Sequence, residues 1–248
     1  MTPINLNEMY RETHQFIDEY RQGAHHTFDE YNYFINQLRN SASIAAFFEL
    51  FEKDTEFDRN EFKRTVIAVE EKVEKLMAHR YLKGEKHWVD SRMAPGYPMV
   101  EREIKALGVE SGGWMYFVGA GALPFTAMLC HDICGARVVC IDRDGEALEL
   151  AHAAVSQRYG AEECQRHFAF ILASAESLVI PDKKIRHMIL AGHCSAKEAI
   201  LNGLAASLTS DCRILVRLPL GVYQYVYDAI DLGRCPSYVK EADRKSVV

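Results

Sequence analysis

The chain has 248 residues, of which 48% are hydrophobic and 26% are charged, and its formal net charge is -6 at pH 7. This length suits one large domain or two small ones with a real core. The mildly acidic balance argues against nucleic acid as a partner, because phosphate contacts need a basic face, and no stretch approaches the roughly 20 apolar residues of a membrane span.

Residues 1–110 have the pattern of an all-α cap domain, with apolar residues recurring at spacings of three and four. Asp58 followed by Glu61 predicts a capping box at the start of a helix that ends near Leu82. Two prolines and a glycine in segment 87–98 then predict a loop that leads into a short helix.

Residues 111–248 have the pattern of a doubly wound α/β domain. Short, almost entirely apolar runs alternate with helical segments, which is typical of a parallel sheet with crossover helices. The expected strands are 114–118, 137–141, 168–172, 187–191 and 212–217, and the expected helices are 123–134, 145–159 and 196–208. We therefore predict an α/β, Rossmann-like fold behind the helical cap.

A glycine turn follows the first expected strand, and an acid ends the second. Gly119 and Gly121 let the backbone approach a ligand, and Asp142 stands where it can accept hydrogen bonds from both ribose hydroxyls. The pattern predicts an adenosine-type cofactor, although an ordinary strand-to-helix turn is the alternative. Pro124 replaces the third glycine of the dinucleotide motif and has no N–H to offer an anion. A cofactor without phosphate, S-adenosylmethionine (SAM), therefore fits better than NAD or ATP.

Residues 117–126, Phe-Val-Gly-Ala-Gly-Ala-Leu-Pro-Phe-Thr, resemble the F-[IV]-G-[GS]-G-P-[LM]-P-L-T signature of nicotianamine synthases. Bacterial relatives in this family make opine-type metallophores such as staphylopine and pseudopaline. The similarity continues at 213–217, at the Tyr-Val-Tyr stretch 225–227 and at the last three residues, while Ala122 departs from the usual proline. The resemblance implies a class I SAM-dependent methyltransferase fold with a helical N-terminal cap.

The resemblance also implies a reaction. Nicotianamine synthase-like enzymes move the 3-amino-3-carboxypropyl (2-aminobutanoyl) group of SAM and release methylthioadenosine, without a metal. The bacterial relatives place this group on the α-amine of histidine, and a partner opine-type dehydrogenase completes the metallophore. We therefore expect a histidine aminobutanoyltransferase that uses SAM as co-substrate.

An amine attacks carbon only when it is deprotonated, so this transfer needs a base and a site that excludes water. By resemblance, the family's catalytic glutamate lies in an E-x-K-[LV]-E pattern on the last long cap helix, and Glu70 to Glu74 match it. Glu70 is the first candidate base and Glu74, one turn later, the second; a solvated charged helix face is the alternative. Tyr97 matches the family's active-site tyrosine, or is packing, and Glu103 is a further candidate.

The candidate ligand contacts follow the strands, because ligands bind at the carboxyl edge of open α/β sheets. Arg217 is expected to clamp a substrate carboxylate through two hydrogen bonds, and Asp144 to cap the next helix. His193 either faces the substrate or is a packed or solvent-facing residue. The cofactor candidates are Gly119, Ala120, Gly121, Asp142, Ser174 and Ala175, and the substrate candidates are His193, Arg217 and Tyr227.

Two other functions stay open: a small-molecule methyltransferase with the same cofactor cradle, and a SAM-binding module without turnover. Three further points are open. They are whether L- or D-histidine is used, whether a second transfer follows the first, and whether the protein forms a homodimer. The first residues carry neither a basic start nor an apolar run, and the seven cysteines form no C-x-x-C pair. We therefore expect a cytoplasmic protein with reduced thiols. The strand-like ending at 246–248 leads us to expect that the natural protein continues.

Overall fold

A computed structural model describes residues 59–85, 96–178, 186–194, 196–204 and 211–218, together with isolated positions between 11 and 19 and between 208 and 231. The chain divides into two compact units. The first comprises Met1–Leu76 and Pro219–Asp228, and the second comprises Met77–Leu218 and Ala229–Val248. Each unit is considered by itself below.

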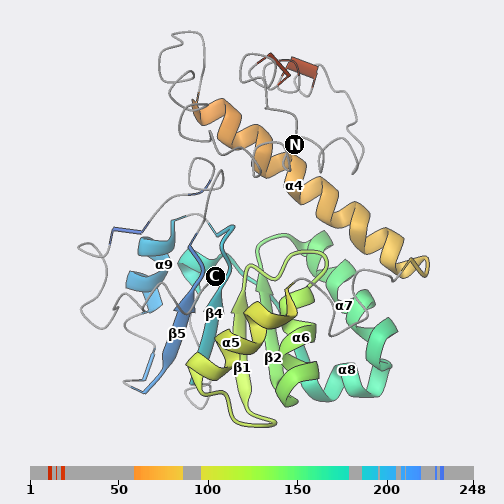
Figure 1. The fold of residues 1–248 in the computed structure, drawn as a ribbon, viewed down its shortest axis with the longest axis vertical. Coiled ribbons are helices and arrows are strands. Elements are labelled where there is room, and N and C mark those ends of the chain that lie inside the picture. Colours follow the sequence, from red (N-terminus) through yellow and green to blue (C-terminus); the bar gives the residue numbers. More distant parts are fainter. Residues whose placement is uncertain are drawn as a thin grey trace, which may run out of the picture. The chain divides into compact units, whose positions relative to one another are not determined.

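Helix α4 spans Arg59–Leu82 and is the long helix in Figure 1. Val66, Val69 and Val73 are buried along it, at the three- and four-residue spacing that the sequence predicted. The predicted end of the helix near Leu82 is confirmed. Asp58, the predicted capping residue, lies outside the described residues.

The second unit is built on a parallel sheet with the strand order β3-β2-β1-β4-β5 (Figure 1). The chain adds β2 and β3 on one side of β1 and then β4 and β5 on the other, so the topological switch point lies between β1 and β4. This order is that of a Rossmann-like fold and confirms the predicted fold class. The strands are β1 (Trp114–Val118), β2 (Arg137–Asp142), β3 (Phe168–Leu172), β4 (His187–Leu190) and β5 (Arg213–Val216).

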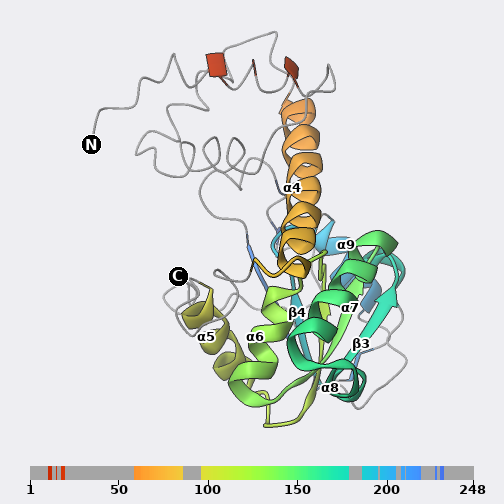
Figure 2. The same ribbon diagram turned by 90° about the vertical axis from the view of Figure 1, so that its right-hand side faces the viewer.

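Helices cover both faces of this sheet. Alternate strand residues, such as Met115 and Phe117, pack with the helices of one face, whereas Tyr116 and Val118 pack with α9 on the other. Figure 2 shows α5, α6 and α7 along the first of these faces. The helices are α5 (Tyr97–Leu107), α6 (Phe125–Cys134), α7 (Gly145–Tyr159), α8 (Ala161–His167) and α9 (Lys197–Leu204), and η1 (Ala175–Ser177) is a single 3₁₀ turn.

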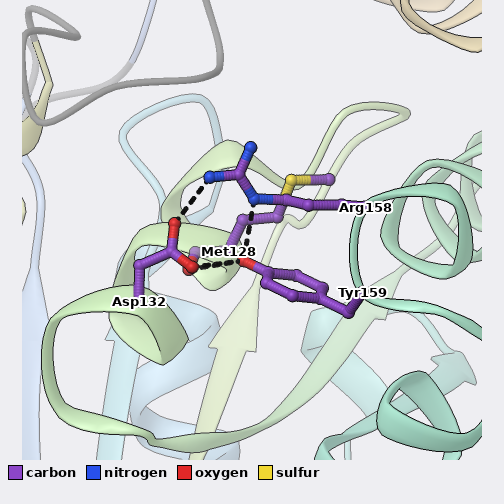
Figure 3. A network of polar contacts seen from close by, with 4 residues as sticks. All are labelled: Met128, Asp132, Arg158 and Tyr159. Carbon is purple, nitrogen blue, oxygen red and sulfur yellow. Dashed lines mark hydrogen bonds and ion pairs between the residues drawn. The ribbon is translucent and has the colours of Figure 1, made fainter.

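A polar network joins the C-terminal ends of α6 and α7 (Figure 3). Arg158 Nη2 donates to Asp132 Oδ2 at 2.8 Å, and Arg158 Nε donates to the hydroxyl oxygen of Tyr159 at 3.1 Å. The single hydroxyl proton of Tyr159 lies within reach of Asp132 Oδ1, at 2.9 Å, and of the Met128 carbonyl, at 3.1 Å. The network therefore ties the two helices together at the end of the sheet opposite the strands' carboxyl ends.

No helix within the described ranges is long and apolar enough to cross a membrane. Within the same ranges, no group of three or more His, Cys, Asp or Glu side chains is placed to hold a metal ion. Six cysteines are described, and each is a free thiol.

Candidate cofactor and substrate site

The glycine turn between β1 and α6 is closed by its own N–H groups. Gly119 and Ala120 both donate to the carbonyl oxygen of Ile141, at 2.9 and 3.0 Å, and Gly121 donates to Asp142 Oδ2 at 2.8 Å. Loops that cradle phosphate instead aim such N–H groups at the anion. Because the three N–H groups of this turn already have acceptors in the protein, the turn allows close approach of a ligand without offering an anion site.

Position 119 requires glycine for two reasons, its backbone conformation and the close approach of neighbouring side chains. Its φ is +80°, and a Cβ placed on it would lie 2.7 Å from Cys194 Sγ and 3.1 Å from Ala191 Cβ. The loop after β4 is therefore packed directly onto the turn, at the switch point of the sheet. Burial raises the pKa of the Cys194 thiol to about 11, so this thiol is protonated at neutral pH and serves as packing.

Asp142 holds two backbone segments at the carboxyl edge of the sheet. Its Oδ2 accepts from Gly121, and its Oδ1 accepts from the Asp144 N–H at 3.1 Å. Each carboxylate oxygen has two lone pairs, so each keeps the capacity for one more donor, such as a ribose hydroxyl. Asp144 Oδ1 accepts from the Ala147 N–H at 3.1 Å and begins α7, which confirms its predicted capping role.

Leu172 adds an apolar surface beside this acid. It pairs with Asp142 in the β2–β3 register and is 64% exposed, so an apolar side chain faces solvent at this edge of the sheet. In the loop that follows, Ser174 Oγ donates to Glu176 Oε2 and lowers the pKa of that carboxyl. Ser174 and Ala175 are half-buried here, and their contact with a cofactor stays a prediction.

Arg217 directly follows β5 and is held by a carboxylate of the protein. Its Nε donates to Glu103 Oε1 at 2.8 Å and its Nη2 to Glu103 Oε2 at 2.7 Å, while Nη1 donates to Thr126 Oγ1 at 3.0 Å. The Arg217 and Glu103 side chains are 17% and 2% exposed. The fork predicted for a substrate carboxylate is thus occupied by Glu103, and the substrate role of Arg217 stays a prediction.

The loop after β4 is anchored by a buried lysine that the sequence analysis did not single out. Lys197 is 2% exposed, and its Nζ donates to the carbonyl oxygens of Gly192, at 2.7 Å, and Cys194, at 2.5 Å. His193 is the residue between Gly192 and Cys194 in the chain, and its side chain is exposed. Its contact with a substrate stays a prediction.

Tyr97 is the first residue of α5 and belongs to the same unit as the glycine turn. A Cβ placed on Gly96 would lie 3.3 Å from the ring of Phe125, so the start of α5 lies against the start of α6. Tyr97 and Phe125 both pack against the main core cluster. The sequence analysis predicted Tyr97 and the glycine turn as separate features. The packing places the start of α5, which carries Tyr97, against the start of α6, which follows the glycine turn.

In the first unit, two candidates that stand 157 positions apart in the chain meet. The Tyr227 hydroxyl donates to Glu70 Oε2, and Tyr227 is 2% exposed. Glu70 is half-buried on α4, as is Glu74 one turn later, whereas Glu71 is exposed. The helix therefore turns the two candidate glutamates away from its most solvated face.

Strand order, glycine turn and strand-end acid together define a Rossmann-like α/β protein. The nicotianamine synthase-like protein MtNAS has the same fold. Its complex with MTA and tNA matches at 15% identity with a TM-score of 0.68, covering 92% of this chain and 88% of that chain. A mutant of MtNAS in complex with S-adenosylmethionine matches at 14% identity with a TM-score of 0.64, covering 91% and 88%.

The chain is homologous to L-histidine 2-aminobutanoyltransferases over half of its length. It is 32% identical over 123 residues to the protein of that name from Yersinia pestis, which covers 50% of this chain and 44% of the relative. The Pseudomonas aeruginosa UCBPP-PA14 protein of the same name is 28% identical over 123 residues, 50% of this chain and 45% of the relative. The match thus spans less than half the length of these relatives. No protein-family model matches the chain.

Proposed function

We propose that this protein is a SAM-dependent aminobutanoyltransferase that acts on the α-amine of histidine and releases methylthioadenosine. The observation that carries the proposal is the 32% identity over 123 residues to an L-histidine 2-aminobutanoyltransferase. The fold shared with MtNAS supports it. So does a glycine turn whose N–H groups are bonded within the protein, because SAM has no phosphate to bind.

The cofactor site in this proposal is the carboxyl edge of β1 and β2. The turn at Gly119 and Gly121 borders the methionyl arm of SAM, the spare lone pairs of Asp142 accept the ribose hydroxyls, and exposed Leu172 offers a face to the adenine ring. Bound SAM supplies an electrophilic carbon on a sulfonium, which is a good leaving group. The fixed geometry of the turn aligns that carbon for attack.

The protein's own contribution to the chemistry is proton removal. A proton of the substrate ammonium must first pass to a base, which frees the nitrogen lone pair. As the N–C bond then forms, the C–S bond breaks and its electron pair goes to sulfur. We assign this base to Glu70, whose Oε2 accepts a hydrogen bond from the Tyr227 hydroxyl that helps to fix the carboxylate. Glu74 is the alternative base. The product then passes to an opine-type dehydrogenase, which we propose as the pathway partner.

Mass spectrometry of the purified protein with SAM tests the proposal. Incubation with L-histidine, D-histidine and other amines in separate reactions is expected to give one acceptor that gains the aminobutanoyl group, together with methylthioadenosine. The same experiment identifies the accepted enantiomer. A methylated acceptor with S-adenosylhomocysteine would instead make the protein a small-molecule methyltransferase, and SAM binding without any turnover would make it a binding module.

The role of Glu70 is tested by Glu70→Gln, with Glu71→Gln as the matched control on the exposed side of the same helix. Removing a general base typically costs about 10²–10⁴-fold in rate. We therefore expect Glu70→Gln to lose transfer and keep its SAM affinity in calorimetry, and Glu71→Gln to stay within twofold of wild type. Unchanged turnover in Glu70→Gln would move the assignment to Glu74.

A further inference from the structure

The ion pair between Arg217 and Glu103 has the features of a permanent pair. Both Glu103 oxygens are used, they accept from Nε and Nη2 along one edge of the guanidinium, and Glu103 is almost fully buried. A substrate carboxylate could use the Nε and Nη2 edge of the guanidinium only by displacing Glu103, which would leave a buried charge without a partner. One carboxylate would replace another with no gain, so the pair is poorly suited to capture substrate.

Glu103 instead anchors helix α5, and α5 begins with Tyr97. The helix is fixed at three points by its neighbours. Arg217, after β5, holds Glu103; Arg213, at the start of β5, donates from Nη1 to the Leu107 carbonyl at 3.2 Å; and Gly96 abuts the Phe125 ring. Thr126, in the first turn of α6, also accepts from Arg217. The guanidinium thus joins the strand end, α5 and the start of α6.

We propose that Arg217 is a positioning residue: through Glu103 it fixes α5 and thereby the place of Tyr97 beside the start of α6, the helix that follows the cofactor turn. Glu103 stands six residues after Tyr97, about 9 Å along the helix axis, so a tilt of α5 about this anchor moves its first turn. The inference rests on the proposed function for the part that concerns catalysis. In this proposal, groups other than Arg217 bind the substrate carboxylate.

Glu103→Gln separates the two roles of Arg217, because they predict opposite outcomes. The glutamine keeps the shape of the side chain, removes its charge and retains one oxygen that can accept, so the ion pair is lost and one edge N–H of the guanidinium loses its acceptor. For a positioning residue, we expect kcat for methylthioadenosine release to fall at least tenfold, with the KM for histidine within twofold of wild type. A KM for histidine that falls severalfold, with kcat retained, would make Arg217 a substrate clamp and overturn the proposal.

The effect must also pass through Tyr97. In a Tyr97→Phe background, Glu103→Gln is expected to lower kcat by less than a further twofold, because residues that act as a unit are not additive. A full tenfold loss on top of Tyr97→Phe would contradict the proposal. Arg217→Lys keeps the charge and loses the fork, and is expected to lower kcat about threefold to tenfold at constant KM. It serves if Glu103→Gln does not fold.

Asp132→Asn is the matched control, since it removes the carboxylate of the other arginine pair on α6, and it is expected to keep kcat within twofold. Amide hydrogen exchange of α5 provides a readout that needs no turnover. Exchange at 97–100 is expected to quicken at least fivefold in Glu103→Gln and to be unchanged in Asp132→Asn. Unchanged exchange in both variants would overturn the positioning role. A wild-type protein that gives no methylthioadenosine would overturn only the proposed function.

Discussion

Helix α6 is held at both ends by an arginine, a carboxylate and a hydroxyl, and the two ends differ in depth. At its N-terminal end Arg217 pairs with Glu103, whose side chain is 2% exposed. At its C-terminal end Arg158 pairs with Asp132 (Figure 3), and the Asp132 side chain is 28% exposed. The deep pair lies at the carboxyl edge of the sheet, where the proposed ligands bind, and the shallow one at the opposite edge. The same three kinds of group therefore position α5 beside the proposed site at one end of α6, in our proposal, and join α6 to α7 at the other end.

Truncating the two arginines gives the largest expected contrast. Arg217→Met leaves the buried Glu103 carboxylate without its partner, a change that typically costs about 3–5 kcal/mol. Arg158→Met leaves Asp132, which water reaches, and is expected to cost about 1 kcal/mol. Urea denaturation of both variants, with the m-value checked against wild type, measures the difference. Equal losses would show that burial does not distinguish the two pairs.

Two glycines with a left-handed backbone conformation lie before and after α6 and allow a second comparison of its two ends. Gly119 precedes the helix with a Cβ position 2.7 Å from Cys194 Sγ, whereas Gly135 ends it with a φ of +67° and only an ordinary contact at 3.8 Å. We expect Gly119→Ala to cost about 2–4 kcal/mol and at least tenfold in SAM affinity, and Gly135→Ala about 1 kcal/mol with unchanged affinity. Thermal unfolding and calorimetry test both. Wild-type affinity in a folded Gly119→Ala protein would remove the turn from the cofactor site.

Tyr159→Phe probes the shallow end alone. The phenylalanine keeps the packing of the ring and removes the hydroxyl that joins Asp132, Met128 and Arg158. Because water reaches Asp132 and can replace part of the network, we expect a loss of about 1 kcal/mol in unfolding free energy. SAM affinity is expected to stay within twofold of wild type. A larger change in affinity would mean that the two ends of α6 are coupled.

Cysteine labelling gives the smallest effect and needs no substitution. With a pKa of about 11, roughly one Cys194 thiol in a thousand is ionised at pH 8, so its alkylation rate is expected to rise about tenfold per pH unit. Bound SAM is expected to slow labelling of Cys194, which lies against the turn, severalfold. Cys134 lies in the last turn of α6, at the opposite edge, and serves as the internal reference. Equal protection of both thiols would place the ligand elsewhere.

The sheet was predictable because its strands are short apolar runs covered on both faces. All five expected strands agree with the structure to within about one residue at each end. The segment now seen as α8 was not predicted, since only Cys164 of its seven residues is buried and such a helix has no apolar period to detect. Its acids in the first turn and bases in the last are the signal that was available.

The local structure of the proposed site was predictable where it depends on neighbouring residues in the chain. The glycine turn, Asp142 and the Asp144 cap each follow from a few adjacent residues. The partner of Arg217 was not predictable, because Glu103 stands 114 positions away and no spacing rule connects a helix to a strand end. Lys197 was also missed, since a lysine at a helix start is usually solvated, and only the tertiary fold buries it under two carbonyls.

The turn whose N–H groups bond to β2 also bears on redesign. Exchange of cofactors in Rossmann-like enzymes is commonly sought at the strand-end acid, here Asp142, because that residue distinguishes the ribose substituents. In this protein such an exchange would also free the Gly121 N–H and loosen the turn, since Asp142 is its acceptor. The proposed recognition of the sugar and the observed closure of the loop thus depend on one side chain, and converting the site to bind a dinucleotide would require rebuilding both together.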